Sequence, residues 1–367
     1  MKTEEKRSFI DWMLDNEVMI SLLVVLLGFL CGTILVLAVG KNPANMFSSI
    51  FDSMVGIPKR DGTWNFRYIG ETLAYSMPYI LCGLSMGLPC RVGLFNIGAE
   101  GQYIMGMTAA QSLALFISPF PGQWFFCLLV AFIAGALWGG IVGLLKAKYN
   151  VSEVVATIML NYIALYASRL ICFHQPGATT YNTDPLPATA LLSKFLIKTS
   201  NLNIGIFFVL LSVLLYWFVV NKTKLGYSMR ATGYNKNAAK CCGISTVRSI
   251  AASMALAGAF AGLAGAIVLQ GGAFPKGRII TGMDNYGFMG IAVSLVGNNT
   301  AIGNLLAGLL FGVLKQSQSL MQSRNIPKEI TFIIQGLIVV FISLRSGLEL
   351  VKLYRNKKKL QKEVLHK

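Results

Sequence analysis

The feature of this sequence that most limits its fold is a series of long apolar segments. A helix that crosses a membrane needs about 20 consecutive, mostly apolar residues, and residues 18–40 supply them without a single charge. Further apolar segments follow at 73–90, 94–117, 124–146, 152–173, 204–221, 249–270, 283–297, 303–320 and 328–345. Lipid cannot hydrogen-bond backbone groups, so such segments must be helical. The sequence predicts an all-α integral membrane protein with about ten transmembrane helices.

Two of these segments carry interruptions. Glycine and proline break the apolar pattern around 90–100 and again around 283–300. Irregular backbone at membrane depth is tolerated where it is buried in protein or lines a cavity. Each of the two segments is therefore expected either to cross the membrane fully or to form a broken, re-entrant helix.

The composition agrees with a lipid-facing surface. Charged residues make up only 13% of the chain, whereas soluble domains carry about 25%. The net charge of +17 would suit a nucleic-acid partner. However, the basic residues lie in short segments between the apolar runs, as in cytoplasmic membrane loops. We therefore expect a lipid bilayer, and no nucleic acid, as the surroundings of this chain.

The distribution of lysine and arginine predicts the orientation. With ten alternating helices and a cytoplasmic N-terminus, twenty basic residues fall on the inner side and ten on the outer side. Cytoplasmic loops carry such an excess. Three regions follow: a cytoplasmic segment 1–17, a transmembrane domain 18–345 and a basic cytoplasmic tail 346–367. The first apolar run lacks a cleavage site and is interpreted as a retained helix. The outer segments 41–72 and 174–203 are long enough to carry structure of their own.

An internal repeat relates two parts of the chain. The glycine-rich stretch 139–146 resembles 308–315, and each precedes a glutamate, Glu153 or Glu329, that opens the next apolar run. The copies are five predicted helices apart, an odd number, so the second copy would be upside down. Inverted repeats are a transporter architecture with the substrate path at the repeat interface; chance similarity between glycine-rich helices is the alternative.

The polar loop 222–248 carries six basic residues and no acid. Residues 235–242 are predicted to form a short helix, with Asn235 as its N-cap and Gly243 as its stop. Such a helix on the membrane surface suits docking to another protein. By itself, the loop also fits an ordinary positively charged connector.

The residues of this loop resemble the coupling segment of permease subunits from ATP-binding-cassette (ABC) importers for branched-chain amino acids, simple sugars and nucleosides. The matching positions are Gly226, Arg230, Ala231, Gly233, Asn235, Ala238, Ala239, Gly243 and Ile244. The stretches 92–102, 153–163 and 253–266 are similar to the family as well. The similarity is strongest to the nucleoside-importing branch and covers most of the chain.

The resemblance implies a bacterial cell-membrane permease that moves its substrate by alternating access. It also implies an ATP-binding subunit pair, a second permease subunit and an extracytoplasmic solute-binding protein as partners. The chain contains no phosphate-binding Gly-x-x-x-x-Gly-Lys-Ser/Thr loop, so ATP is expected on the partner and no cofactor on this chain. Arg230 would pair with an acid of the ATPase, or else anchor the loop to lipid phosphate; the first interpretation is favoured.

Five polar or aromatic residues near broken or polar helices are candidates for the translocation path: Asn96, Glu100, Gln102, Asn161 and Tyr162. Ionisable groups in a membrane usually face a cavity or a partner. The structural alternative for Glu100 is that it caps a broken helix or pairs with Arg91. For Asn161 and Tyr162 the favoured alternative is hydrogen bonding between helices.

The remaining motifs are interpreted as structural. The glycines at 135, 139 and 143, at 258 and 262, and at 308 and 312 are spaced for close helix packing. The seven cysteines and two histidines show no metal-ligand or catalytic spacing, so we expect neither a metal site nor enzymatic activity. Permeation of a simple sugar such as ribose remains an alternative. So does an ion-gradient-driven secondary transporter, for which Glu100 is the only candidate intramembrane acid.

Overall fold

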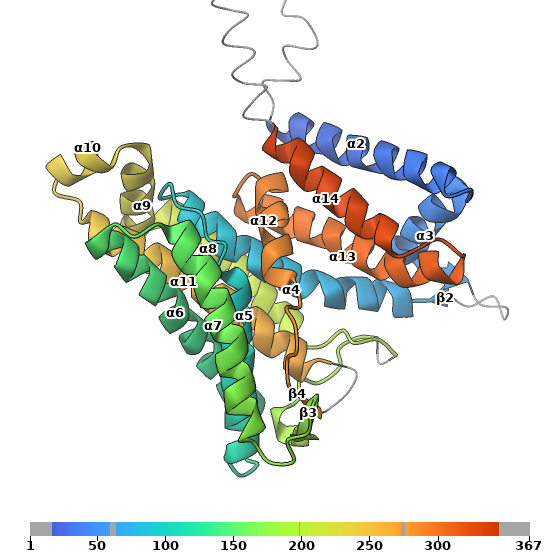
Figure 1. Cartoon of the computed structure of the whole chain (residues 1–367), viewed down its shortest axis with the longest axis horizontal. Coiled ribbons are helices and arrows are strands. Elements are labelled where there is room, and N and C mark those ends of the chain that lie inside the picture. The colour runs from blue at the N-terminus through green and yellow to red at the C-terminus, as the bar shows by residue number, and fades with distance from the viewer. Residues whose placement is uncertain (1–16, 59–63, 198, 273–275, 345–367) are drawn as a thin grey trace, which may run out of the picture. The chain divides into compact units, whose positions relative to one another are not determined.

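The computed structural model describes residues 17–58, 64–197, 199–272 and 276–344, and these form two compact units. The smaller unit combines residues Met1–Phe47 with Met321–Lys367 and the larger one comprises Ser48–Leu320. The predicted cytoplasmic segment 1–17, apart from Glu17, and the predicted tail 346–367 lie outside the described residues. Figure 1 shows the helices of both units.

In the smaller unit, α2 (Glu17–Ala38) packs against α14 (Glu329–Ser343). Gly28 and Gly32 allow this approach. A Cβ atom at either position would lie 2.5 Å from Ile338 or Ile334. Small residues let membrane helices come close enough to gain van der Waals contact.

The larger unit is built on a tightly packed helix pair, α6 (Gln123–Tyr149) and α11 (Thr246–Gln270). A Cβ atom at Gly135 would collide with the Gly258 carbonyl, and one at Gly258 would collide with the Gly135 carbonyl. The predicted packing role of these glycines is confirmed. The glycines at 308 and 312 similarly face Ile80 and Ser76 of α4 (Arg67–Cys90).

Every predicted apolar segment contains a helix, but the bounds differ. The other segments hold α5 (Ala99–Phe116), α7 (Glu153–Phe173), α8 (Gly205–Lys222), α12 (Tyr286–Val296) and α13 (Ala301–Ser323). Among the described residues, six helices are long and apolar enough to cross a membrane: α2, α4, α6, α7, α8 and α11. With 11 and 15 residues, α12 and α14 are shorter, and α5 and α13 carry many polar side chains. Ten crossings therefore stay a prediction.

The two predicted outer segments carry structure, as expected. The first contains α3 (Pro43–Val55) and the antiparallel strands β1 (Ile57–Pro58) and β2 (Trp64–Asn65), and α4 already begins within it at Arg67. The second contains β3 (Asn182–Pro185) and the short 3-10 helix η1 (Ala188–Ala190). β3 pairs antiparallel with β4 (Lys276–Arg278), in register Asn182 to Arg278. The all-α prediction missed these strands, because runs of two to four residues have no recognisable alternation.

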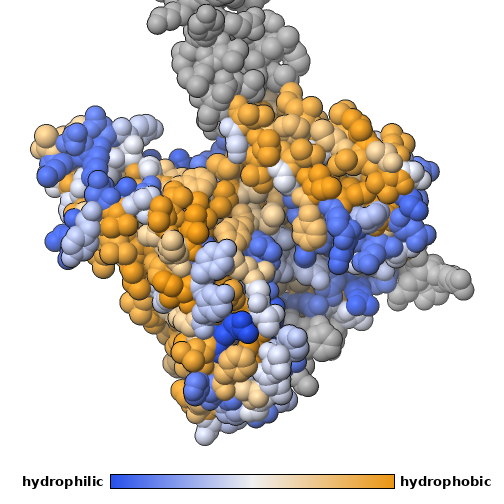
Figure 2. Space-filling model, in the orientation of Figure 1, coloured by the Kyte–Doolittle hydropathy of each residue, from blue (hydrophilic) through white to orange (hydrophobic). Residues whose placement is uncertain are grey.

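Hydrophilic side chains gather at one end of the larger unit. Figure 2 shows them over α9 (Lys224–Tyr234) and α10 (Lys236–Cys241), whereas hydrophobic side chains cover α6 and the beginning of α7 next to them. In Figure 1, β3 and β4 lie at the opposite end of the same unit. The bundle therefore has an apolar belt between two polar ends, as a membrane protein requires.

Candidate functional site: a basic elbow linked to buried helix ends

The loop between α8 and α11 folds into two short helices, α9 and α10, which we call the elbow. The Thr223 hydroxyl caps α9 by accepting a hydrogen bond from Gly226 N (3.1 Å). Asn235 ends α9 and caps α10, because its Oδ1 accepts from Asn237 N and Ala238 N at 3.0 Å each. Gly243 follows with φ +78°, in the left-handed region that glycine tolerates. The cap and the stop are confirmed; α9 was missed.

The residues of the coupling motif divide into a buried set and an exposed set. Gly226 and Ala239 are buried, and a Cβ atom on Gly226 would collide with backbone carbonyls at the end of α8. Arg230, Ala231 and Ile244 are half-buried. Gly233, Asn235, Ala238 and Gly243 are exposed. The buried glycine and alanine hold the elbow against the bundle, and the exposed set leaves a surface free for a partner.

Gly233 connects the elbow to the segment between α4 and α5. A Cβ atom at Gly233 would collide with the Arg91 carbonyl and would lie 3.2 Å from the carbonyl carbon of Val92. Backbone therefore packs directly on backbone at this position. α9 and the start of the α4–α5 connection are thus in direct contact.

A hollow of about 230 Å³ opens beside this contact. It is lined by Cys90, Arg91, Arg230, Gly233 and Tyr234. The Nε atoms of Arg91 and Arg230 are buried and have no hydrogen-bond partner among the described residues. The Tyr234 side chain is 92% exposed. Two guanidinium groups beside an exposed aromatic ring form a site suited to a carboxylate.

Three polar side chains from the α4–α5 region bond to one another in the core. Asn96 Nδ2 donates to Gln102 Oε1 (3.0 Å), and Gln102 Nε2 donates back to Asn96 Oδ1 (3.2 Å). Ser85 Oγ lies 3.2 Å from Asn96 Nδ2. All three residues are buried. Asn96 and Gln102 thus fix the turn that leads into α5, with their polar atoms directed at protein partners.

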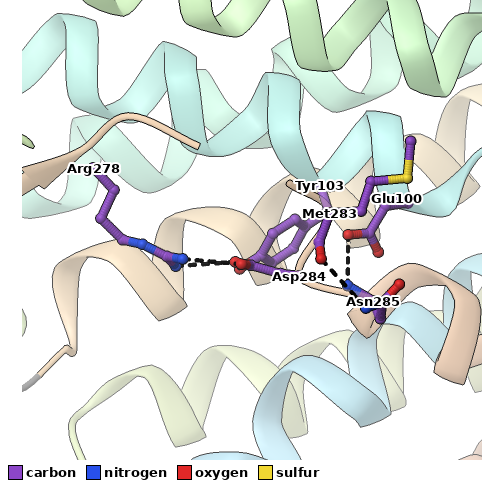
Figure 3. A network of polar contacts seen from close by, with 6 residues as sticks. All are labelled: Glu100, Tyr103, Arg278, Met283, Asp284 and Asn285. Atoms are coloured by element: carbon purple, nitrogen blue, oxygen red, sulfur yellow. Dashed lines mark hydrogen bonds and ion pairs between the residues drawn. The ribbon is translucent and has the colours of Figure 1, made fainter. Parts of the chain in front are cut away.

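Glu100 caps a different helix from its own. Its carboxylate oxygens accept from Asn285 N (2.8 Å) and Gly287 N (2.7 Å), at the start of α12, as Figure 3 shows for Asn285. A carboxylate near a helix N-terminus is favoured by the orphan N–H groups and the helix dipole. The capping interpretation is therefore correct. Pairing with Arg91 is wrong, because the Arg91 guanidinium donates to the Asn299 carbonyl (2.7 Å).

The segment before α12 contributes residues that sequence reasoning missed. Arg278 donates to both carboxylate oxygens of Asp284 at 2.9 Å, and Tyr103 Oη donates to Asp284 Oδ2, also at 2.9 Å; Figure 3 shows this network. Burial alone would lower the pKa of Arg278, but the hydrogen-bonded Asp284 raises it above its ordinary value. The sequence feature that could have predicted this ion pair is the spacing of Arg278 and Asp284, six residues apart with Gly282 between them.

The two candidates on α7 behave differently. Asn161 is buried; its Oδ1 accepts from Gly101 N (2.8 Å) and its Nδ2 donates to the Ile97 carbonyl (3.0 Å). Asn161 thus caps α5 from a neighbouring helix, as the favoured alternative predicted. Tyr162 is 54% exposed and does not join the buried cluster.

No group of three or more His, Cys, Asp or Glu side chains that could hold a metal ion occurs in the part of the chain that the structure describes. The elbow, the α4–α5 connection and the α5–α12 junction instead form one continuous set of packed and hydrogen-bonded contacts. Such a set can transmit a displacement, and its exposed end can bind an acidic partner.

Comparison with known proteins places this arrangement in context. Residues 68–343 match the family model described as branched-chain amino acid transport system / permease component. The guanosine ABC transporter permease protein NupP of Bacillus subtilis is 36% identical, over 89% of this chain and 93% of its own length. The nucleoside ABC transporter permease protein NupB of Lactococcus lactis is 34% identical, over 92% and 93%. The glucose ABC transporter permease protein TsgB13 of Haloferax volcanii is 29% identical, over 87% and 85%. No solved structure matches the chain.

Proposed function

Because this chain belongs to the branched-chain amino acid transport system / permease component family, we propose that it is the permease subunit of an ABC importer for nucleosides. The cargo is inferred from the two relatives above 30% identity, which are named as a guanosine permease and a nucleoside permease. A simple sugar is the second candidate, because a glucose permease matches over most of the chain.

The observation that carries this proposal is the elbow. It presents exposed Lys224, Lys236 and Lys240 with the exposed ring of Tyr234, and it packs through Gly233 on the α4–α5 connection. Tyrosine and arginine are enriched among the residues that dominate protein interfaces. We assign the elbow as the docking surface for a separate ATP-binding subunit.

The hollow beside the elbow supports a specific contact. Arg91 and Arg230 line it, and their Nε atoms find no partner among the described residues. A buried donor without an acceptor costs about 1–3 kcal/mol, so an acceptor from outside the chain would relieve that cost. We propose that an acidic side chain of the ATPase enters here and pairs with Arg230.

The transport step is proposed as alternating access driven from the elbow. Closure of the ATPase pair would shift α9, and the Gly233–Arg91 contact would pass the shift to the α4–α5 connection. That connection ends at Asn96 and α5, whose Glu100 holds the start of α12. A change in the angle between helices α5 and α12 would open the path on one side and close it on the other.

The arrangement in the membrane is proposed from the charge distribution. Both termini and the elbow would be cytoplasmic, with about ten crossings. The inverted repeat is supported by Glu153 and Glu329, each of which lies in the first turn of the helix that follows a glycine-rich one. α5 and α12 would be the broken helices at its centre.

The partners follow from this arrangement. A second permease subunit would complete the translocation path, and an extracytoplasmic solute-binding protein would dock on the outer segments 41–72 and 174–203. These segments contain α3, the strands β1, β2 and β3, and η1. Their folded structure would supply a defined surface for such a partner.

Uptake into membrane vesicles tests the proposal. Vesicles with the complete set of subunits are expected to accumulate labelled guanosine when ATP is supplied, also after ionophores have collapsed the ion gradients. Vesicles with this chain alone serve as the control and should show no accumulation. Uptake by this chain alone, driven by a proton or sodium gradient, would instead identify a secondary transporter.

A further inference from the structure

A small cavity lies beside the first half of α4, apart from the coupling motif, and it meets α12 only at Tyr286, the first residue of that helix. Its volume is about 100 Å³. Glu71 and Tyr75 of α4, Asn201 and Asn203 ahead of α8, and Tyr286 at the start of α12 supply its polar and aromatic lining. All five residues belong to the larger unit.

Glu71 is the charged group of this cavity and is only 8% exposed. Its Oε1 accepts from Asn201 N (3.2 Å) and its Oε2 from Asn201 Nδ2 (3.1 Å). A carboxylate offers about four acceptor positions, so about two remain. The ion pairs Lys146–Glu153 and Arg278–Asp284 do not involve Glu71. A buried charge is costly unless it is fully hydrogen-bonded, so this carboxylate needs further donors from whatever fills the cavity.

The two tyrosines add a flat apolar face and two hydroxyl groups. Both are half-buried, and neither phenolic oxygen has a hydrogen-bond partner among the described residues. The Tyr286 ring is held from behind, with its centroid 5.2 Å from Tyr79 and 5.7 Å from Tyr103. A rigid aromatic ring presents a surface to the C–H face of a ligand, and the hydroxyl groups present polar atoms at its edge.

The size of the cavity selects the ligand group. At about 100 Å³ it is smaller than the roughly 150 Å³ cavity that holds a whole benzene molecule, so it takes the hydroxyl-bearing edge of a small ring and is too small for a fused purine. A ring with two neighbouring hydroxyl donors on one edge and C–H groups on its face meets both requirements. The pentose of a nucleoside and the ring of a simple sugar share this chemistry.

We propose that the cavity lined by Glu71, Tyr75 and Tyr286 binds the sugar ring of the transported molecule, with Glu71 accepting hydrogen bonds from two of its hydroxyl groups. This inference rests on the proposed function and adds a cargo contact to it. It accounts for a site that would serve nucleosides and simple sugars alike, because the nucleobase stays outside the cavity.

Saturation-transfer NMR on the purified full chain in lipid nanodiscs tests the proposal, with guanosine and 2′,3′-dideoxyguanosine as probes at millimolar concentration. We expect the strongest transfer to the ribose protons of guanosine and at least about tenfold weaker binding of the dideoxy analogue. Glu71→Gln keeps an acceptor for Asn201 but removes the charge; it should weaken guanosine binding about tenfold, which corresponds to one charge-assisted hydrogen bond. Glu329→Gln, at an exposed position in the first turn of α14, is the matched control and should bind like wild type.

Several results would overturn the assignment. One is transfer centred on the base protons; another is unchanged binding in Glu71→Gln. If Glu71→Gln lowers the melting temperature, guanosine binding is compared in Tyr75→Leu instead. Tyr149→Leu, at an exposed position, is its control. Unchanged guanosine binding in Tyr75→Leu would count against the cavity as a binding site. A melting temperature that rises with sodium chloride in wild type but not in Glu71→Gln, without transfer to the sugar, would identify a cation as the occupant.

Uptake by the complete transporter separates this inference from the proposed function. Normal ATP-driven guanosine uptake in wild type and in both variants, Glu71→Gln and Tyr75→Leu, would reject the cavity as a cargo contact and would still support the importer. Failure of the wild-type complex to take up any nucleoside or sugar would reject the importer and, with it, the cargo contact.

Discussion

At the scale of single residues, the core of this permease is organised by side chains that cap helices other than their own. Glu100 lies in the first turn of α5 but accepts hydrogen bonds from the start of α12. Asn161 lies in the middle of α7 but accepts from Gly101 N in α5. The first N–H groups of a helix have no partner within it, so each capping side chain joins two helices and satisfies a group that lipid cannot.

Replacement of Asn161 by alanine tests this role. The change leaves Gly101 N and the Ile97 carbonyl without their partners in a buried site, which should lower the free energy of unfolding by about 1–3 kcal/mol. Thermal melting of the purified protein in detergent measures the effect. Tyr162→Phe, on the exposed side of the same helix, is the control and should melt within experimental error of wild type. Equal melting temperatures for both variants would contradict the capping role.

At the scale of structural elements, the elbow combines a rigid attachment with an open surface. Gly226 and Ala239 are buried against the bundle, whereas Tyr227 and Tyr234 are 63% and 92% exposed. Large exposed aromatic side chains outside the apolar belt are typical of a docking site. Because Gly233 lies against the Arg91 backbone, the elbow is placed to move the α4–α5 connection.

The variant Gly233→Ala tests whether transport needs the contact between α9 and the α4–α5 connection, in a protein that still folds. Even a methyl group would collide with the Arg91 carbonyl, so α9 should shift while the helices of the bundle keep their packing. We expect inserted, folded protein whose ATP-driven uptake falls about tenfold, within the range of allosteric coupling energies. Gly140→Ala is the matched control, because its Cβ would meet only Ala255 at 3.7 Å. Normal uptake by Gly233→Ala would remove the elbow from the transmission route.

Arg230 is predicted to dominate binding of the ATPase. Arg230→Ala should weaken that binding by about 2–5 kcal/mol, because an interfacial acid would be left buried without its partner. Lys236→Ala, which removes an exposed charge, should cost less than about 1 kcal/mol. Isothermal titration calorimetry of the purified subunits compares the two. Equal losses would indicate a diffuse electrostatic attraction in place of a specific ion pair.

At the scale of the whole molecule, the positive charge of the chain defines its proposed orientation. The elbow carries lysine and arginine without acids, and basic loops stay on the cytoplasmic side during insertion. Cys241 and Cys242 on the elbow are exposed, whereas Cys82, Cys127 and Cys172 are buried. Labelling of Cys241 and Cys242 can therefore show on which side of the membrane the elbow lies.

A membrane-impermeant maleimide tests the orientation when the chain is expressed without its partners. We expect labelling of inside-out vesicles and little labelling of intact cells. Cys241→Ser with Cys242→Ser should remove the larger part of the signal, because only the half-buried Cys31 and Cys90 remain accessible in part, and added ATPase subunit should protect the wild-type elbow cysteines. Elbow labelling in intact cells would reverse the proposed topology.

The sequence alone determined the positions of the helices and the chemistry of the elbow. Apolar runs, the Asn235 cap and the Gly243 stop are local features, encoded within about one helix length, and the structure follows them. The spacing of Gly135, Gly139, Gly258 and Gly262 similarly predicted close packing. The start of α4 at Arg67 and the extra helix α9 were not evident, because their polar and aromatic residues lack a strong apolar pattern.

Only the tertiary structure decided which groups meet. Glu100 and its donor at Asn285 are 185 residues apart, and the choice of α12 over Arg91 depended on how α5 and α12 pack. The cavity at Glu71 likewise needs residues from four separate segments. Hydropathy is a property of each segment, so it can be read along the chain. The partners of a buried polar group depend on the long-range packing that brings distant segments together.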